Sequence, residues 1–338
     1  MGADPLSQPI IATDVSAEFD QLTSRCAFLD RSSCGRIVVT GNDRLDLLHR
    51  LSTNDLLKHA PGDVVSTVFT TEKGRIIDYV QVGIRESSLL LFCSAGMEET
   101  LSAWIDKYTI MDDVRLEGIS KTTVLFSVIG PESLERVSST LDLRLTPNSI
   151  VDAHLKFGEV TVLCRIERDT VICDLVARTD DAKSLRDLLQ RSETEIEEGS
   201  QDAFEFYRIS RGVPNTGSEL NESYNPFDIG LLDAVGFSKG CYIGQEVIAR
   251  LDTYQKAQKS LYGLISDAAQ GSVPAGSTVL VNDTEAGTIT SASRSSVRGK
   301  QVMMAVLKKE LAHADDSYRA VQPGRSYVLS ARDFPINV

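Results

Sequence analysis

The stretch "FSKGCYIGQEVIARL", residues 237–251, combines residue types that a packing segment rarely needs. It places the thiol of Cys241 between a Lys239–Gly240 pair and an aromatic side chain. Gly240 permits a close backbone approach or a positive φ angle, and the apolar spacing from Ile243 onward predicts a short helix. A nearby lysine and a helix N-terminus both favour a thiolate, which is the reactive form of cysteine. The alternative is a buried cysteine that packs as a small hydrophobic side chain.

The other cysteines are sparse and irregularly spaced. Six cysteines in 338 residues form no CxxC pair and no Cys/His quartet, which argues against a structural zinc site or a self-contained iron–sulfur ligand set. Thiols at this density are typical of a reducing compartment. We expect packing roles for the five cysteines outside the opening stretch, which are Cys26, Cys34, Cys93, Cys164 and Cys173.

Composition bounds the class of protein. The chain is 42% hydrophobic and 25% charged, which is ordinary for a soluble protein with two or three domains. Its net charge of −13 argues against direct nucleic-acid or membrane binding, because phosphate surfaces demand clustered cations. The N-terminus lacks the basic and apolar regions of a secretion signal. We expect a cytoplasmic protein, or one of an organelle matrix if a presequence was trimmed.

The pattern of predicted elements favours the α+β class. Strands and helices follow one another in hairpins rather than in regular βαβ units, with turn signals at residues 71–74 and 168–169. After Leu251 the chain becomes a succession of short strands with Gly, Pro and Asn–Asp turns. That texture predicts a small antiparallel barrel or sandwich. The domain boundary is expected near residues 255–262.

Familiar catalytic and phosphate-binding motifs are missing from the sequence. Its four histidines form no recognisable triad or HExxH pair, and GxSxG, GxGxxG and GxxxxGK[ST] segments do not occur. A Cys–His hydrolase is compatible with the composition, but no local motif supports it.

A resemblance to a known family is much more specific. The segment "KGCYIGQE" resembles the K-G-C-[YF]-x-G-Q-E signature of the YgfZ-type folate-binding proteins, which are relatives of the glycine-cleavage T-protein, an aminomethyltransferase. Similar blocks extend over almost the whole chain, at residues 35–56, 71–82, 207–217 and 225–246. The signature residues of this chain are Lys239, Gly240, Cys241, Tyr242, Gly244, Gln245 and Glu246.

The resemblance implies a fold and a cofactor. The fold is a three-domain T-protein-like cloverleaf around a central folate channel, with a C-terminal antiparallel β-barrel. Residues 1–255 would form the aminomethyltransferase-like, folate-binding region of two interleaved α+β subdomains, and residues 256–338 the barrel. The implied cofactor is tetrahydrofolate or another reduced one-carbon folate, without a permanently bound metal.

The resemblance also implies folate contacts. Asp78 takes the place of the T-protein aspartate credited with acid–base assistance, although Tyr79 replaces its acidic neighbour. Asp174 matches the acid that binds the pterin edge, where a carboxylate suits the N–H donors. Arg208 replaces the arginine that meets the folate glutamate tail. Ser94 stands where the T-protein has an asparagine, which weakens that contact.

Each contact has a structural alternative. Asp78 could instead cap a turn or pair with Arg75. The motif around Asp174 has drifted from the family pattern. Arg208 could bridge to the acidic run beside it, which includes Glu205.

The family relatives point to three functions. YgfZ-type proteins are linked to the assembly or repair of iron–sulfur clusters in selected enzymes, and through them to tRNA modification. A tetrahydrofolate-binding accessory protein of that kind is the leading hypothesis, with Cys241 and Asp78 as its working groups and with iron–sulfur enzymes or cluster-assembly proteins as partners. Gln245 and Glu246 would fix the turn that aims the thiol. The alternatives are a tetrahydrofolate-dependent aminomethyl (one-carbon) transferase and a folate-binding regulator or scaffold without chemistry.

Overall fold

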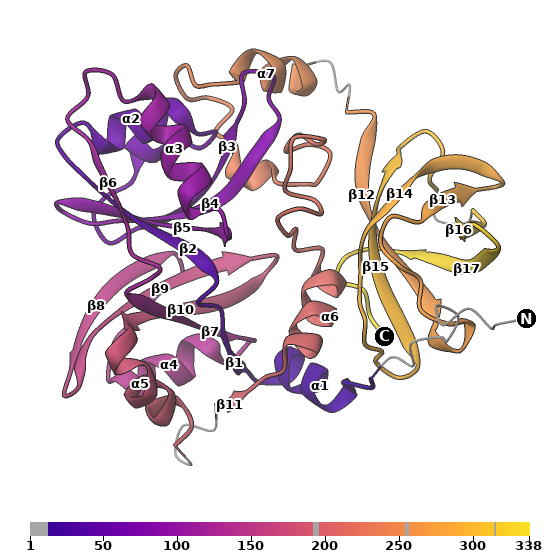
Figure 1. The fold of residues 1–338 in the computed structure, drawn as a ribbon, viewed down its shortest axis with the longest axis horizontal. Coiled ribbons are helices and arrows are strands. Elements are labelled where there is room, and N and C mark those ends of the chain that lie inside the picture. Colours follow the sequence, from indigo (N-terminus) through magenta and orange to yellow (C-terminus); the bar gives the residue numbers. More distant parts are fainter. Residues whose placement is uncertain (1–12, 192–195, 254–256, 314–315) are drawn as a thin grey trace, which may run out of the picture. The chain divides into compact units, whose positions relative to one another are not determined.

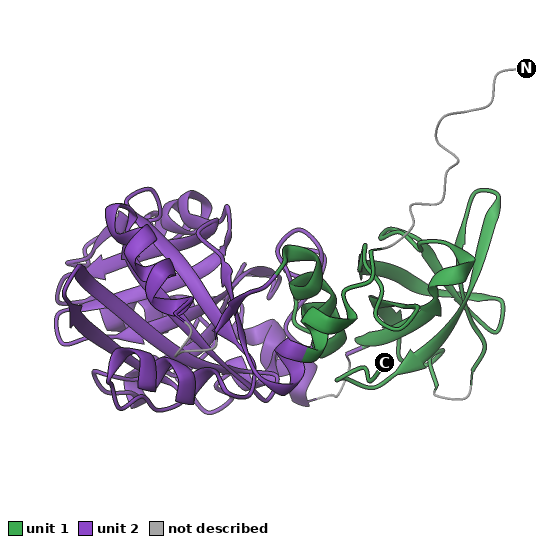
Figure 2. Ribbon diagram, turned by 90° about the horizontal axis from the view of Figure 1, so that it is seen from below, with its two compact units in different colours: residues 1–20, 200–214, 258–338 green, residues 21–199, 215–257 purple. Residues whose placement is uncertain are grey.

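The computed structural model describes residues 13–191, 196–253, 257–313 and 316–338. The chain forms two compact units, coloured separately in Figure 2. The domain boundary expected at residue 255 falls among residues outside the described ones. Unit 1 comprises residues 1–20, 200–214 and 258–338, and unit 2 comprises residues 21–199 and 215–257.

The first half of unit 2 is a five-stranded sheet covered on one face by two helices (Figure 1). Its strand order is β3-β4-β5-β2-β6, and every pairing is antiparallel. The strands are β2 (Cys34–Thr40), β3 (Val64–Thr70), β4 (Ile76–Ile84), β5 (Ser88–Ala95) and β6 (Arg115–Gly118). The helices are α2 (Arg44–Leu51) and α3 (Glu98–Tyr108), and η1 (Leu56–Lys58) is a single 3₁₀ turn.

The second half of unit 2 repeats this plan with six strands, in the order β11-β1-β7-β10-β9-β8. Helices α4 (Ser133–Leu141) and α5 (Ala182–Leu189) cover its outer face. The strands are β1 (Ala27–Asp30), β7 (Thr123–Ile129), β8 (Ser149–Leu155), β9 (Gly158–Glu167), β10 (Thr170–Arg178) and β11 (Glu197–Glu198), with η2 at Thr179–Asp181. Because β1 precedes β2 in the chain but lies in the other sheet, the two halves are interleaved.

The two sheets pack face to face, so unit 2 has four layers. Their inner faces share an apolar cluster that includes Phe92 of β5 and Leu163 of β9. Gly83 of β4 packs closely there, and a Cβ at this position would lie 2.5 Å from Ile150 Cδ1, so that the isoleucine side chain would have to shift. Side chains that interdigitate at this distance leave no room for a methyl group.

Local sequence explains the β9–β10 hairpin, whose turn is at Arg168–Asp169 as the sequence predicts. Both residues have positive φ angles, 47° and 64°, which is the geometry of a tight hairpin turn. This turn sets the register of the strands, in which Cys164 lies directly opposite Cys173.

The last part of unit 2 is mostly loop. It contains η3 (Leu232–Ala234) and α7 (Gln245–Thr253). The tip of the β3–β4 hairpin lies against α7, since a Cβ on Gly74 would be 3.2 Å from Val247. The hairpin tip at residues 71–74 is the turn that the sequence predicts.

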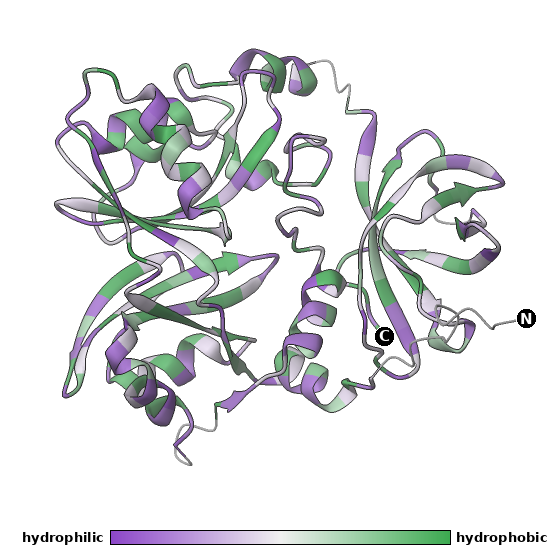
Figure 3. Ribbon diagram, viewed as in Figure 1, coloured by the Kyte–Doolittle hydropathy of each residue, from purple (hydrophilic) through white to green (hydrophobic). Residues whose placement is uncertain are grey.

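Unit 1 contains a closed six-stranded barrel in the order β12-β15-β14-β13-β16-β17. Every pairing is antiparallel, which confirms the barrel predicted from sequence. Buried and less buried residues alternate along β13, as expected when one face of a strand lines a core, and Figure 3 shows hydrophobic residues on the barrel strands. The strands are β12 (Lys259–Asp267), β13 (Thr278–Val281), β14 (Thr284–Ala292), β15 (Lys300–Lys308), β16 (Tyr318–Gln322) and β17 (Arg325–Arg332), with η4 at Ala268–Gln270.

Helix α1 (Ser16–Ser24) begins in unit 1 and ends in unit 2, and α6 (Gln201–Arg211) belongs to unit 1. Ser200 caps α6 by accepting a hydrogen bond from the Ala203 amide, and Gly212 ends it in the left-handed conformation. None of the helices described has the length and apolarity needed to cross a membrane.

Candidate functional site

The cysteine loop, residues 236–244, carries the thiol singled out in the sequence. Cys241 is exposed, whereas the five other cysteines are buried, as expected for packing residues. The thiol is therefore reachable from solvent. It lies before α7, which begins at Gln245, rather than in the first turn of that helix.

Lys239 anchors this loop. Its ammonium is buried and donates hydrogen bonds to the carbonyls of His49, Ser52 and Asn54 at 2.5, 2.7 and 2.8 Å. These carbonyls lie at and just beyond the C-terminal end of α2, where the helix dipole favours a cation. Burial lowers the pKa of Lys239 to about 8. Because its three N–H groups are directed at backbone carbonyls, Lys239 holds the loop in place, and an effect of its charge on the Cys241 thiol stays a prediction.

Further hydrogen bonds attach the loop to α2 and β3. The Gly236 amide donates to the Thr53 carbonyl at 2.9 Å, and the Ile243 amide donates to the Arg50 carbonyl at 3.1 Å. The Thr70 hydroxyl donates to the Ile243 carbonyl at 2.8 Å. The signature segment 239–246 and the early block 35–56, far apart in sequence, are therefore direct partners in the fold.

The signature glycine that the backbone conformation requires is Gly244. Its φ is +84°, and a Cβ there would lie 2.7 Å from the Thr71 carbonyl oxygen. Gly240, to which the sequence analysis gave this role, has no positive φ and open space around its Cα. Only glycine adopts such a conformation in so tight a space without strain.

The remaining signature residues have separate roles. Tyr242 is buried, and its ring lies 4.9 Å from the Lys239 ammonium, a cation–π contact. The backbone amide of Gln245 closes a turn by donating to the Tyr242 carbonyl. The Glu246 carboxylate pairs with Arg250 on the exposed face of α7, so the carboxylate itself does not fix the turn, in contrast to the expectation for this residue.

Asp78, on β4, is fully buried and held by three hydrogen bonds. Its carboxylate accepts from the Tyr79 amide and the Ser94 amide, each at 2.9 Å, and from the Ser94 hydroxyl at 2.5 Å. Burial raises the pKa of Asp78 to about 6, although these hydrogen bonds oppose the rise. The alternative pairing with Arg75 is not what the structure shows, because Arg75 donates to the Ser223 carbonyl.

This environment suits proton transfer. A carboxyl group that titrates near 6 holds or releases a proton close to neutral pH. Phe69 lies opposite Asp78 in the β3–β4 pairing, and Trp104 packs edge-on against Phe69 with ring centroids 5.6 Å apart. The single tryptophan of the chain is thus close to this strand pair.

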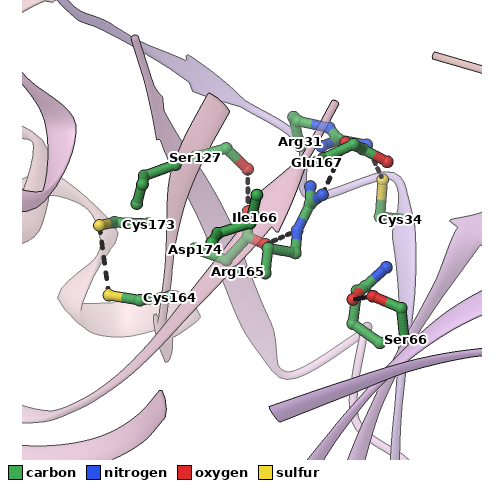
Figure 4. Close-up of polar contacts among 12 residues, drawn as sticks. Arg31, Cys34, Ser66, Ser127, Cys164, Arg165, Ile166, Glu167, Cys173 and Asp174 are labelled. Atoms are coloured by element: carbon green, nitrogen blue, oxygen red, sulfur yellow. Dashed lines mark hydrogen bonds and ion pairs between the residues drawn. The ribbon is translucent and has the colours of Figure 1, made fainter. Parts of the chain in front are cut away.

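Asp174, on β10, is also buried but lies beside a cation (Figure 4). Arg165 Nε donates to its carboxylate at 2.8 Å, and the Ser127 hydroxyl donates to the other oxygen. Burial raises the pKa of Asp174, but the attraction of Arg165 and Arg31 outweighs burial and holds the pKa below its usual value. A pterin at this carboxylate would have to displace donors that the chain already supplies.

Arg208, in unit 1, is also engaged by its own chain. The guanidinium forms a two-pronged pair with Glu205 and donates to the Val213 carbonyl at 2.7 Å and the Ser291 hydroxyl at 3.1 Å. Glu205, the alternative partner considered from the sequence, does therefore pair with Arg208. Contact of Arg208 with folate stays a prediction.

Sequence reasoning missed Arg165 and Glu167, which form a second ion pair at 2.6 Å beside Asp174. The position of the hairpin turn is enough to predict that Arg165 and Asp174 lie near each other. With the turn at 168–169, Arg165 and Asp174 lie diagonally on one face of the β9–β10 pair, a spacing at which opposite charges meet.

Among the described residues, no group of three or more His, Cys, Asp or Glu side chains is placed to hold a metal ion. The structure brings Ser94 together with Asp78, and the cysteine loop together with the end of α2 and the β3–β4 hairpin.

Comparison with family models gives two matches that together span most of the chain. The model described as "GCVT N-terminal domain" matches residues 7–239. The model described as "Glycine cleavage T-protein C-terminal barrel domain" matches residues 259–335.

Individual proteins give the same picture. A chloroplastic protein of Arabidopsis thaliana, named only provisionally as a transferase, is 31% identical over 80% of this chain, a match that spans 63% of the relative's own length. The aminomethyltransferase of Thermotoga neapolitana is 24% identical over 94% of this chain and 88% of its own. The crystal structure of the glycine cleavage system aminomethyltransferase T from Bartonella henselae matches with a TM-score of 0.82, at 17% identity, over 95% of this chain and 89% of that one.

Proposed function

We propose, on the premise that this chain belongs to the glycine cleavage T-protein family, that it binds a reduced folate and works through Cys241 as an accessory protein for iron–sulfur enzymes. Within that family the signature at residues 239–246 resembles the YgfZ type. The partners would be iron–sulfur enzymes or the proteins that assemble their clusters, and tRNA modification would depend on the protein only through such enzymes. A reducing compartment, either the cytoplasm or an organelle matrix, would keep the thiol free.

The observation that carries the proposal is the placement of Cys241. Its side chain is exposed, yet the loop that bears it is held by the buried ammonium of Lys239 and by backbone hydrogen bonds to residues 50–53. A thiol with only a packing role needs neither exposure nor such an anchored loop. A fixed, reachable thiol suits reaction with a partner or a small molecule.

The proposed folate contacts differ in how readily this chain supplies them. The buried Asp78 and the partly buried Ser94 form a polar pair whose carboxyl changes protonation near pH 6, which suits a folate nitrogen. Asp174 and Arg208 already carry ion pairs, so a bound folate must exchange with Arg165 or Glu205 to use them. Asp78 is therefore the residue on which the folate proposal depends most.

A one-carbon transferase is the second candidate. The raised pKa of Asp78 is a property expected of a general acid or base, and several relatives are named aminomethyltransferases. In that function Asp78 would move the proton and Cys241 would be dispensable.

Separate variants distinguish the candidates. Cys241→Ala, Asp78→Asn and, as a matched control in the same loop, Ser238→Ala are expressed in cells that lack the protein, and the activities of cluster-dependent enzymes are measured. The accessory function predicts that Cys241→Ala abolishes rescue and Ser238→Ala retains it. Asp78→Asn, which weakens folate binding but leaves the thiol in place, should retain rescue when reduced folate is supplied in excess. Full rescue by Cys241→Ala would contradict the accessory proposal, and failure of Asp78→Asn alone would favour the transferase. A scaffold without chemistry would keep partner binding in both variants.

A further inference from the structure

Cys164 and Cys173 form a close cross-strand pair outside the site described above. They are direct partners in the β9–β10 register, and their sulfur atoms lie 3.3 Å apart (Figure 4). Both side chains are fully buried in the apolar core between the sheet and helices α4 and α5.

We propose that this pair is a redox modification site, at which a small hydroperoxide such as hydrogen peroxide converts the two thiols into an intramolecular disulfide. Directly opposite residues of antiparallel strands have Cα atoms about 4.5–5.5 Å apart, within the range of about 4.4–6.8 Å that disulfides span. A disulfide bond is about 2.05 Å long, so the two sulfurs need to approach only a little further. The hairpin already supplies the alignment that two cysteines distant in sequence would lack.

The reaction balances with one hydroperoxide. A thiol sulfur attacks the outer peroxide oxygen, the O–O bond breaks, and the products are a sulfenic acid and one water molecule when hydrogen peroxide is the oxidant. The second thiol then attacks the sulfenic sulfur, which forms the S–S bond and releases a second water molecule. Two cysteine sulfurs are oxidised by two electrons in total, and the peroxide is reduced by two.

Burial sets the rate and the choice of oxidant. The hydrogen bond with Cys164 and burial raise the pKa of the Cys173 thiol well above its usual value, and the thiolate is the nucleophilic form. The pair should therefore react more slowly than the exposed Cys241. A bulky disulfide reagent has no route into this core while the fold is closed, whereas hydrogen peroxide is close in size to water.

The modification would act on a neighbouring part of the fold. Arg165 directly follows Cys164, and Asp174 directly follows Cys173, with their side chains on the opposite face of the sheet. A bridge between the cysteines would fix the two strands that hold this buried ion pair. The oxidised protein should therefore unfold at a higher denaturant concentration than the reduced protein.

Peptide mapping tests the proposal directly. The full-length chain is treated with hydrogen peroxide, its remaining thiols are alkylated after denaturation, and it is digested with trypsin without reduction. Trypsin cleaves after Lys156, Arg165, Arg168 and Arg178, which places the two cysteines in the separate peptides 157–165 and 169–178. We expect these peptides to appear as one linked species that reducing agent splits.

Three variants control the experiment. Cys241→Ala removes the exposed thiol and should leave the link unchanged. Cys164→Ser and Cys173→Ser should each abolish it and leave the partner cysteine trapped as sulfenic acid or alkylated. Separate, fully alkylated 157–165 and 169–178 peptides, from protein in which Cys241 is already oxidised, would overturn the proposal. Linkage of either cysteine to Cys26, Cys34 or Cys93 instead would overturn it as well.

Discussion

Asp78 and Asp174 are both buried carboxylates on central strands of unit 2, but their surroundings differ in one respect. Asp174 has a guanidinium within hydrogen-bonding distance, whereas the hydrogen bonds found at Asp78 come from neutral donors, the Tyr79 and Ser94 amides and the Ser94 hydroxyl. The pKa of Asp174 is lowered, and that of Asp78 is raised to about 6.

This difference in pKa suggests a structural role for Asp174 and a chemical role for Asp78. An ionised carboxylate paired with arginine stabilises its neighbourhood only while both partners are present. A buried carboxyl without a cation exchanges its proton near neutral pH. When two carboxyl groups of one protein have pKa values that their environments shift in opposite directions, the two groups usually have different roles. Asp78 is therefore the group suited to act on a bound molecule, and Asp174 is suited to hold the second sheet together.

The largest effect is expected from Arg165→Met. It leaves the Asp174 carboxylate buried without its cation, and breaking one partner of a buried pair costs about 3–5 kcal/mol. Chemical denaturation at pH 7 measures the loss. Arg250→Met, which removes an exposed arginine paired with the exposed Glu246 on α7, is the matched control and should cost less than about 1 kcal/mol. Equal losses of unfolding free energy in the two variants would contradict the view that Asp174 depends on a buried ion pair.

The pH dependence of stability is the next effect. Because the folded-state pKa of Asp78 is raised, its contribution is present below about pH 4 and is lost as the pH rises through about 6. The rise of the Asp78 pKa on folding corresponds to about 3 kcal/mol of unfolding free energy. The difference in free energy of unfolding between wild type and Asp78→Asn should fall by this amount from pH 4 to pH 7.

Asp174 gives the opposite sign in the same measurement. Its pKa is lowered on folding, so its stabilising contribution is present above the ordinary pKa and is lost as the pH falls below about 4. If the two sites showed the same sign, the assigned difference in environment would be wrong.

The same substitution at the two sites sharpens the comparison at pH 7. Asp174→Asn removes the negative charge that pairs with Arg165, and we expect a loss of about 2 kcal/mol. Asp78→Asn removes a charge that is costly to bury, so the change should stay within about 1 kcal/mol. The denaturation midpoints of the two variants measure both losses of stability. A larger loss in Asp78→Asn than in Asp174→Asn would contradict the prediction.

The smallest effect is expected from Ser94→Ala. It removes the hydroxyl donor to the Asp78 carboxylate, a hydrogen bond of about 1.5 kcal/mol, and so raises the pKa of Asp78 further. The pH window found for the wild type should shift upward. Ser127→Ala is the matched control, since Arg165 still holds Asp174 ionised.

Much of the fold could be read from local sequence. The positive φ at Asp169 and the helix end at Gly212 follow from residue types that favour those conformations. The positive φ at Arg168 follows from the two-residue hairpin turn that it shares with Asp169. The barrel follows from regularly spaced short strands and turn residues. In each case the determining residues lie within a few positions of the feature.

The site was harder because its partners are distant in sequence. Lys239 precedes Cys241 by two residues, which suggested a charge effect on the thiol, yet its ammonium bonds to carbonyls near residue 50. The choice between Gly240 and Gly244 depends on the position of Thr71, which no local pattern reveals. Only the Arg165–Asp174 pair could have been derived, from the hairpin register.

Tetrahydrofolate binding across pH 5–8, followed through Trp104 fluorescence in the wild type and in Asp78→Asn, tests the central claim most directly. Contact between Asp78 and the folate predicts micromolar binding by the wild type, with an affinity that changes around pH 6, and binding at least about tenfold weaker without that pH step in Asp78→Asn. Absence of micromolar binding, or identical pH profiles for the two proteins, would contradict it.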